Sequence, residues 1–227
     1  MIRDARQSGF LLRQDAELIL APTQLEGVEV PDSWLQILIS KNSVATNLSY
    51  WDDYSEVMPL TVAKVRSLMT DSFLIRKNES GVYLLVNRLY RPNLEISSFM
   101  ISDNPRIAKW KPEVSEVLPQ LPAMYRRFMF ELGDGWNRNS DPMKGLFGSQ
   151  DVRPLSDDLT IDPNKRINKG KLDITKTYML AGRRYKSTLC FELGASNDIS
   201  YLKWAGAYAG QRRDFWEEMD DVLSSFF

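Results

Sequence analysis

The sequence predicts an α+β fold, in which an antiparallel β-sheet carries helices packed mainly on one of its sides. Two predicted β-hairpins, one in each half of the 227-residue chain, indicate the sheet. Amphipathic segments indicate the helices, because their apolar residues recur every three or four positions. Hydrophobic residues make up 43% of the chain and aromatic residues 11%, so a chain of this length can bury a sizeable core.

The first expected elements are two helices, a hairpin and a third strand. A helix from Pro31 has Trp34 and Leu38 on its apolar face, and a helix from Pro59 has Thr61 as its expected N-cap. The segments SFLIRK and VYLLVNRLY flank the turn NESG, which predicts a hairpin. The segment LEISSFMI then predicts one more strand.

A stretch with two prolines and several charges, SDNPRIAKWKPE, is the best candidate for a domain boundary, near residues 102–112. Residues 1–105 are expected to form either a separate α+β module or an elaboration of the same sheet. Residues 106–227 are expected to form the second domain.

The second domain opens with LPQLPAMYRRFMFELGDGW, which ends at Trp136. Pro122 suits the first turn of a helix, and the apolar residues that follow it share one face. Gly133 comes after the last of them, where a left-handed cap needs no side chain. Asp134 to Trp136 are expected to form the exit turn.

The rest of the second half alternates between irregular and periodic sequence. Residues 137–171 contain three prolines and three glycines with little periodicity, which predicts a long loop. ITKTYML and YKSTLCFEL predict a second hairpin, and ISYLKWA a further strand. The closing segment DFWEEMDDVLSSFF predicts an amphipathic helix, with Asp214 as its cap and Glu217 three residues later as in a capping box.

The chain lacks the residues and motifs of common enzymes. It has no histidine, which excludes Ser-His-Asp triads, Cys-His pairs and most zinc sites. Gly133 and Gly135 follow a predicted helix, whereas phosphate-binding loops precede one. The single cysteine, Cys190, is expected to be a buried thiol in a strand. We therefore expect a protein that is not an enzyme, with no cofactor and no metal site.

Charge and hydropathy restrict the partners and the location. The 29 Lys and Arg against 30 Asp and Glu leave no basic surplus for binding nucleic acid. No segment approaches the roughly 18 apolar residues of a membrane span. The N-terminus lacks the apolar run of a signal peptide, and one cysteine fits a reducing compartment. These features predict a cytoplasmic protein that binds neither nucleic acid nor membrane.

Three regions are candidate partner-binding surfaces. The first is the 137–171 loop with the tryptophan before it, because functional contacts favour loops on a rigid scaffold. The second is the acidic outer face of the last helix, which attracts a basic partner if it is more than a solvated face. The third is the Trp-Asp-Asp-Tyr segment at residues 51–54, for which a strand end or turn is the simpler interpretation. The candidate contact residues are Trp136, Arg138, Asp151, Arg153, Asp157, Asp158, Glu217, Glu218, Asp221, Trp51, Asp52 and Asp53.

Three segments of the second half occur in a characteristic order. They are LPAMYRRFMFELGDGW from Leu121, TLCFEL from Thr188, and DFWEEMDDVLSSFF, in which Phe215 takes an aromatic position. Over residues 107–227 their order and spacing resemble the SUKH superfamily of bacterial immunity proteins, which also includes eukaryotic cell-wall and signalling regulators. Gly-Asp-Gly stands here where the family usually has Asn-Gly.

The resemblance implies an antiparallel-sheet domain that binds a cognate antibacterial toxin or secreted effector and occludes its active site. The family shares no catalytic residues, and its binding surfaces vary, so no contact residue is carried over. Two other functions stay open. One is an adaptor or chaperone for a secreted effector or assembly, and the other is a carboxylate-dependent enzyme that uses Asp157 and Asp158 or the acidic last helix.

Overall fold

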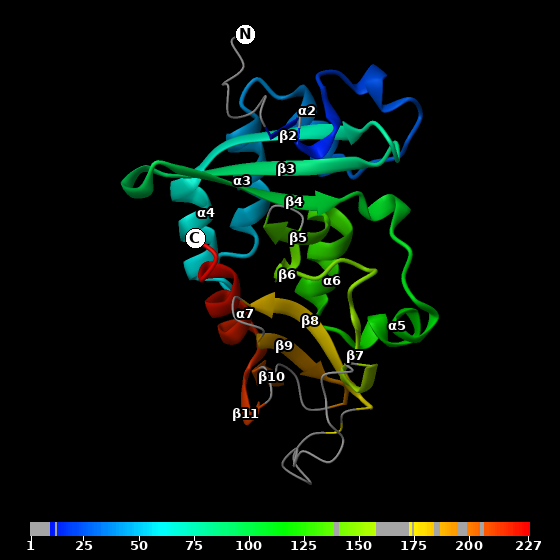
Figure 1. Ribbon diagram of the computed structural model, residues 1–227, viewed down its shortest axis with the longest axis vertical. Helices are drawn as coiled ribbons and strands as arrows, with labels where there is room; N and C mark the ends of the chain where they lie inside the picture. The colour runs from blue at the N-terminus through cyan, green and yellow to red at the C-terminus, as the bar shows by residue number, and fades with distance from the viewer. Residues whose placement is uncertain are drawn as a thin grey trace.

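The computed structural model describes residues 10–11, 13–138, 141–157, 173, 175–183, 187–194, 199–204 and 207–227. Within them, one antiparallel sheet of eleven strands runs along the long axis of the molecule, with helices beside it (Figure 1). The spatial order is β1-β2-β3-β4-β5-β6-β8-β9-β10-β11, and β7 pairs with β8 beside this path. The strands are β1 (Ala16–Ile19), β2 (Met69–Lys77), β3 (Tyr83–Arg91), β4 (Ile96–Asp103), β5 (Asp134–Arg138), β6 (Asp141–Leu146), β7 (Arg153–Pro154), β8 (Thr177–Arg183), β9 (Ser187–Glu192), β10 (Ile199–Trp204) and β11 (Ala207–Asp214).

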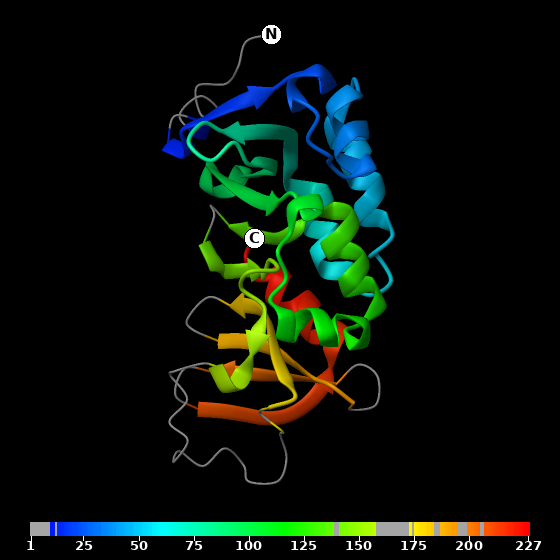
Figure 2. The same cartoon turned by 90° about the vertical axis from the view of Figure 1, so that its right-hand side faces the viewer.

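The helices gather mainly on one side of this sheet, as the sequence predicts (Figure 2). The α-helices are α2 (Asp32–Ile39), α3 (Ser43–Asp52), α4 (Pro59–Leu68), α5 (Pro112–Val117), α6 (Ala123–Arg127) and α7 (Phe215–Ser224). A π-helical segment, η5 (Phe128–Leu132), continues α6. The 3-10 turns are η1 (Pro22–Leu25), η2 (Pro92–Leu94), η3 (Pro105–Ile107), η4 (Leu118–Gln120) and η6 (Leu155–Asp157).

The hairpin of β2 and β3 shows why the sheet needs cover on both faces. Successive side chains of a strand point to opposite faces, and here both sets are apolar. Phe73 and Val86 pack in a cluster with Phe10, whose ring stacks on Phe99 at 4.1 Å between centroids. Their neighbours on the other face, including Leu74, pack in a cluster to which α2 contributes.

The sheet continues across the boundary expected near residue 105. Strand β4 pairs with β5 in antiparallel register, with Met100 opposite Arg138 and Asp103 opposite Asp134. The largest apolar cluster also draws on both sides of that position, from Trp51 to Phe226. Residues 1–105 and 106–227 therefore share one sheet and the largest apolar cluster, the arrangement of an elaborated sheet.

Several sequence predictions are confirmed. The hairpins at β2–β3 and β8–β9, the strands β4 and β10, and the helices α2, α4 and α7 are all present. The Asp214 side chain caps α7 by accepting hydrogen bonds from the N–H groups of Trp216 and Glu217, at 2.9 and 2.8 Å. The cap satisfies donors that the helix itself leaves unpaired.

The exit from the motif helix differs from the prediction. Asp134 to Trp136 begin strand β5 and do not form a turn. Gly133 is extended, with φ 164°, and is not a left-handed cap. A side chain is excluded there for another reason: a Cβ on Gly133 would lie 2.3 Å from the Cβ of Ser102 in β4. Pro122 also lies one step earlier than expected, at the N-cap of α6.

The start of α4 is also different. Met58 holds the N-cap position that the sequence gives to Thr61. The N–H groups of Leu60 and Thr61 donate instead to the carboxylate of Asp220 in α7, at 2.9 and 2.6 Å. A carboxylate that accepts these bonds satisfies orphan donors of the first turn and complements the helix dipole.

The region expected to be a loop, residues 137–171, contains regular structure. Strand β6 pairs with β5 and β8, and β7 and η6 follow it. Gly145 is one reason why β6 was not recognised as a strand. The structure requires glycine there, because a Cβ would lie 2.0 Å from the carbonyl oxygen of Trp136. Its strand therefore carries a glycine where a β-rich residue is expected. Residues 158–172 lie outside the described part of the chain.

The three segments that carry the SUKH resemblance meet at one buried ring. Phe215 of α7 packs edge-on against Phe191 of β9, at 5.4 Å between ring centroids and an interplanar angle of 82°. It packs in the same manner against Tyr125 of α6, at 6.5 Å and 80°. Edge-to-face aromatic pairs add about 0.5–1.5 kcal/mol beyond their burial. The first, second and third segments thus share one core cluster.

Candidate partner-binding surface

The acidic face of the last helix is smaller than the sequence indicates. Glu217 and Asp221 are exposed, but Glu218 and Asp220 are buried. Asp220 is committed to the N-terminus of α4, and Lys64 of α4 donates to the carbonyl of Ser224 at 2.8 Å. The side of α7 that packs thus includes two of the expected surface carboxylates. The prediction that Glu218 is an exposed contact residue is therefore wrong.

The Trp-Asp-Asp-Tyr segment lies at the C-terminal end of α3. Trp51 is 2% exposed and packs on Phe128 and on Trp136, whose ring centroid lies 4.7 Å away. Its prediction as a surface contact is wrong, because the ring belongs to the main core. Asp52 and Asp53 are exposed and form ion pairs with Arg66 and Arg127, at 2.5 and 2.6 Å. Exposed pairs of this kind add little stability, typically under about 1 kcal/mol.

Trp136 is likewise a core residue and not a surface contact. It is 1% exposed, and its ring also packs on Phe227 at 5.6 Å between centroids. Arg138, at the end of β5, is half-buried. The prediction is wrong for Trp136 because β5, which follows Gly133, places the ring in the main core. There it packs against Trp51 of α3 and Phe227, which follows α7.

A buried carboxylate anchors the turn after β6. Asp134 accepts hydrogen bonds from the N–H and the hydroxyl of Ser149, at 2.5 and 2.6 Å. Gly135 has φ +79°, and a Cβ there would lie 2.7 Å from the backbone nitrogen of Gly148, so this close backbone approach needs glycine at position 135. Burial raises the pKa of Asp134 to about 6, the bonds from Ser149 oppose the rise, and Asp103 and Asp151 add to it.

Three sequence-predicted residues, Asp151, Arg153 and Asp157, follow this turn in the chain and are at least partly exposed. Asp151 is half-buried, and burial raises its pKa while Arg153 and Lys111 oppose the rise. The guanidinium of Arg153 donates to the carbonyl of Asp151 at 3.3 Å. Asp157 is exposed at the end of η6, and Asp158 lies outside the described residues. Within the described residues, no ion pair or hydrogen bond joins Asp157 to Asp151 or Arg153.

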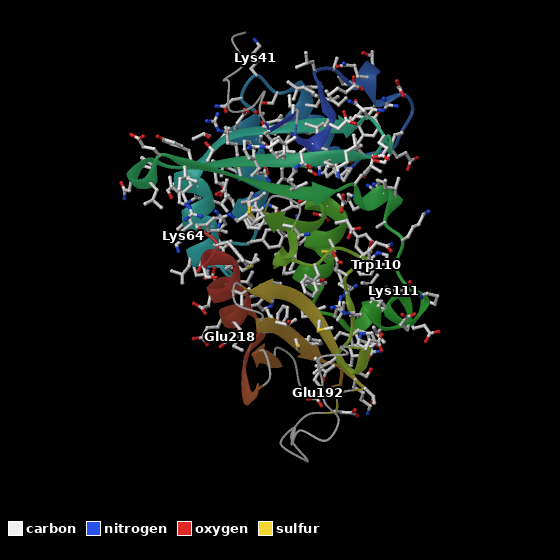
Figure 3. All side chains as sticks on the ribbon, viewed as in Figure 1. Lys41, Lys64, Trp110, Lys111, Glu192 and Glu218 are labelled. Carbon is white, nitrogen blue, oxygen red and sulfur yellow. The ribbon has the colours of Figure 1, made fainter. Side chains whose placement is uncertain are left out.

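One exposed segment carries charged and apolar residues that the sequence interpretation used only as a boundary. It runs from Arg106, within η3, to Lys111, immediately before α5. Ile107 is 46% exposed, and Phe130 of η5, which lies beside the segment, is 39% exposed. The Trp110 ring lies 6.2 Å from that of Phe130, and Figure 3 shows Trp110 and Lys111 on the opposite side of the molecule from Glu218. We refer to Arg106–Lys111 with Phe130 as the 106–111 surface.

A signal for this surface is present in the sequence. Arg-Ile-Ala-Lys-Trp-Lys places three cations and a tryptophan within six positions, between Pro105 and Pro112. Tryptophan and arginine are enriched in the energetically important parts of protein interfaces. The two prolines favour a boundary, whereas the residues between them favour binding.

The described part of the chain shows neither a metal-binding group of side chains nor a membrane-spanning helix. There, no three His, Cys, Asp or Glu side chains are grouped as a metal site requires. None of the helices in the same residues has the length and apolarity needed to cross a bilayer. Comparison with known proteins found no matching family model, curated protein or solved structure.

Proposed function

We propose that this chain is a non-enzymatic immunity protein that binds a cognate antibacterial toxin in the cytoplasm and occludes its active site. One observation carries the proposal. The three segments that resemble the SUKH superfamily, far apart in the sequence, share one core cluster at Phe215. A SUKH-like domain requires these segments to pack on one another, and the contacts at Phe215 meet that requirement.

The proposal assigns separate roles to the core and the surface. The aromatic residues of the resembling segments, Tyr125, Phe191 and Phe215, are buried and build the scaffold. Contacts with the toxin then come from exposed side chains on loops and short helices that this scaffold fixes in place. A rigid surface loses little conformational entropy on binding, which favours affinity.

A co-expression experiment tests the proposal. The protein encoded by the upstream gene is expressed alone and together with this chain, and growth and complex formation on size exclusion are measured. We expect the upstream product to arrest growth when expressed alone, and we expect this chain to restore growth and to co-elute with it. Unchanged toxicity without a complex, or an upstream product with no toxicity, contradicts the proposal.

The same experiment separates this function from that of an adaptor or chaperone. An adaptor binds the effector and leaves its activity intact, so a complex forms while growth stays arrested. A catalytic mechanism restores growth without a stable complex. Restored growth together with a stable complex is the pattern expected of an immunity protein.

A further inference from the structure

We propose that the 106–111 surface is the docking site for the toxin and that it accepts a carboxylate-rich face of that protein. This inference rests on the proposed function and adds the location of the interface and the charge of the partner. It reverses the expectation from the sequence, in which an acidic surface attracts a basic partner.

The charges of the surface support an acidic partner. Arg106 and Lys109 are exposed and Lys111 is half-buried, and none of the three forms an ion pair with the residues that the structure describes. Arg66 and Arg127, in contrast, have carboxylates at 2.5 and 2.6 Å. Exposed cations that form no ion pair within the described residues attract a complementary surface and accelerate its encounter.

Two carboxylates near the surface have lysine neighbours. Asp151 lies close enough to Lys111 for the ammonium group to oppose the rise of its pKa. Asp103 interacts with Lys77, on β2. Burial raises the pKa of both aspartates, and neither of them forms an ion pair with Arg106 or Lys109 within the described residues.

The apolar part of the surface provides the contact area that a stable interface needs. Ile107 and Phe130 are the large exposed apolar residues of this region, and the ring of Trp110 lies beside that of Phe130. The buried Nε1 of Trp110 has no hydrogen-bond acceptor within the described residues. Apolar and aromatic anchors surrounded by charges are typical of an interface core with a polar rim.

The backbone of the surface is fixed before any partner arrives. Asn104 is fully buried, accepts from the N–H of Arg106 at 3.1 Å and donates to the carbonyl of Glu29 at 2.7 Å. Gln150 donates to the carbonyl of Lys109. The carbonyl of Lys111 accepts from the first turn of α5, from Val114 at 2.9 Å. The side chains thus extend from a preorganised segment, which lowers the entropic cost of binding.

Single-stranded nucleic acid is the other class of partner that cations next to an aromatic ring can bind. Such sites follow a strand with a long basic groove, whereas this chain has a net charge of -1 and this surface has three cations. The observations therefore favour a protein, and nucleic acid is retained as an outcome of the test.

The test compares two double charge reversals in the full chain. Arg106→Glu with Lys109→Glu changes the surface, and Arg13→Glu with Lys41→Glu makes the same change of charge at exposed positions elsewhere. Figure 3 shows Lys41 at the far end of the molecule from Trp110. We expect the first variant to weaken the Kd for the toxin at least about tenfold and the control to leave it within about threefold. Equal affinities for wild type and both variants overturn the inference and leave the proposed function intact.

The apolar contact is tested separately, by Phe130→Ala against Leu94→Ala, whose side chain is 58% exposed at η2. We expect a loss of binding for Phe130→Ala alone, and both variants should unfold at the same denaturant concentration as the wild type. Loss of binding for Leu94→Ala with no effect of Phe130→Ala moves the interface to η2 and overturns the inference.

A zero-length carbodiimide cross-link identifies the partner's chemistry, because it joins a lysine amine only to a carboxylate in contact with it. In the wild-type complex we expect Lys109 or Lys111 to be linked to Asp or Glu of the toxin. Links from toxin lysines to Glu217 or Asp221 contradict the inference in favour of the acidic helix. If a single-stranded oligonucleotide binds through Arg106 and Lys109 while toxin binding is unaffected, the surface serves nucleic acid and the inference fails. Absence of any complex with wild-type protein instead rejects the proposed function.

Discussion

The carboxylate of Asp220 accepts a hydrogen bond of 2.6 Å from the backbone N–H of Thr61, 159 residues earlier in the chain. The hydroxyl of Thr61 returns a bond to the carbonyl of Asp220 at 3.2 Å. Helix α7 thereby replaces the local cap that α4 lacks. This contact links the two ends of the sequence, and it explains why a carboxylate of the expected acidic surface is buried.

Asp220→Ala removes this inter-helix cap. We expect the free energy of unfolding to fall by about 2 kcal/mol, because two N–H donors at the start of α4 lose their acceptor. Urea unfolding followed by circular dichroism measures the change. Glu217→Ala, three residues earlier on the exposed side of α7, is the matched control with an expected change below about 0.5 kcal/mol. Equal losses in both variants contradict this role of Asp220.

Phe215→Ala removes the ring on which the three resembling segments meet. Because Phe215 is fully buried against Phe191 and Tyr125, we expect a loss of about 3 to 5 kcal/mol in the free energy of unfolding. Phe130→Ala, an exposed phenylalanine, should cost less than about 1 kcal/mol by the same measurement. A small effect of Phe215→Ala shows that this cluster is not a principal part of the core.

Gly133→Ala tests the close approach of β5 to β4. The added Cβ meets Ser102, and we expect a loss of about 2 kcal/mol or more from overpacking. Ser102→Gly removes the opposing atom, so the double variant should be more stable than the sum of the single changes by about 1 kcal/mol or more. A double-mutant cycle in urea measures this coupling, and strictly additive losses indicate that Ser102 does not set the requirement for glycine.

Asp134→Asn tests the buried carboxylate through pH. The ordinary pKa of the group is 3.8 and burial raises it to about 6, so the folded state binds the proton more tightly than the unfolded state. Protonation of Asp134 therefore stabilises the folded wild type. This contribution to the free energy of unfolding is fully present below pH 3.8 and is lost as the pH rises through about 6. The variant does not titrate, so its stability relative to the wild type should rise by about 2 to 3 kcal/mol between pH 4 and 7.5. Urea unfolding at both values measures it, and a difference independent of pH is the contradicting result.

The sequence predicts well those elements whose pattern of apolar residues and local caps matches the way they pack in the fold. The β2–β3 and β8–β9 hairpins carry β-branched and aromatic residues on both arms, and α7 carries its own cap at Asp214. Helix α3 was missed because its stripe is weak. Asn42 begins it by accepting from the N–H of Ala45 at 3.0 Å, and only its C-terminal end, at residues 51–54, was interpreted, as a strand end or turn.

The misplaced surface residues share one physical cause, which is that long-range packing decides their burial. Trp51 and Trp136 pack on each other although 85 positions separate them in the sequence. Glu218 lies on the packed side of α7. Carboxylates occur on both sides of this helix, so the sequence alone does not distinguish the buried ones from those of a solvated face. Strand β11 was missed because its sequence, Ala-Tyr-Ala-Gly-Gln-Arg-Arg-Asp, contains no β-branched residue. The strand forms through its antiparallel pairing with β10.

The central claim is that this chain neutralises a toxin by binding it, and a titration of toxin activity in vitro tests that claim most directly. A fixed amount of the purified upstream-encoded toxin receives increasing amounts of this chain, and residual activity is measured. The account predicts a linear fall to zero that ends at a fixed stoichiometric ratio, as occlusion of an active site requires. Activity that stays constant at molar excess, or that disappears at far below stoichiometric amounts, contradicts it.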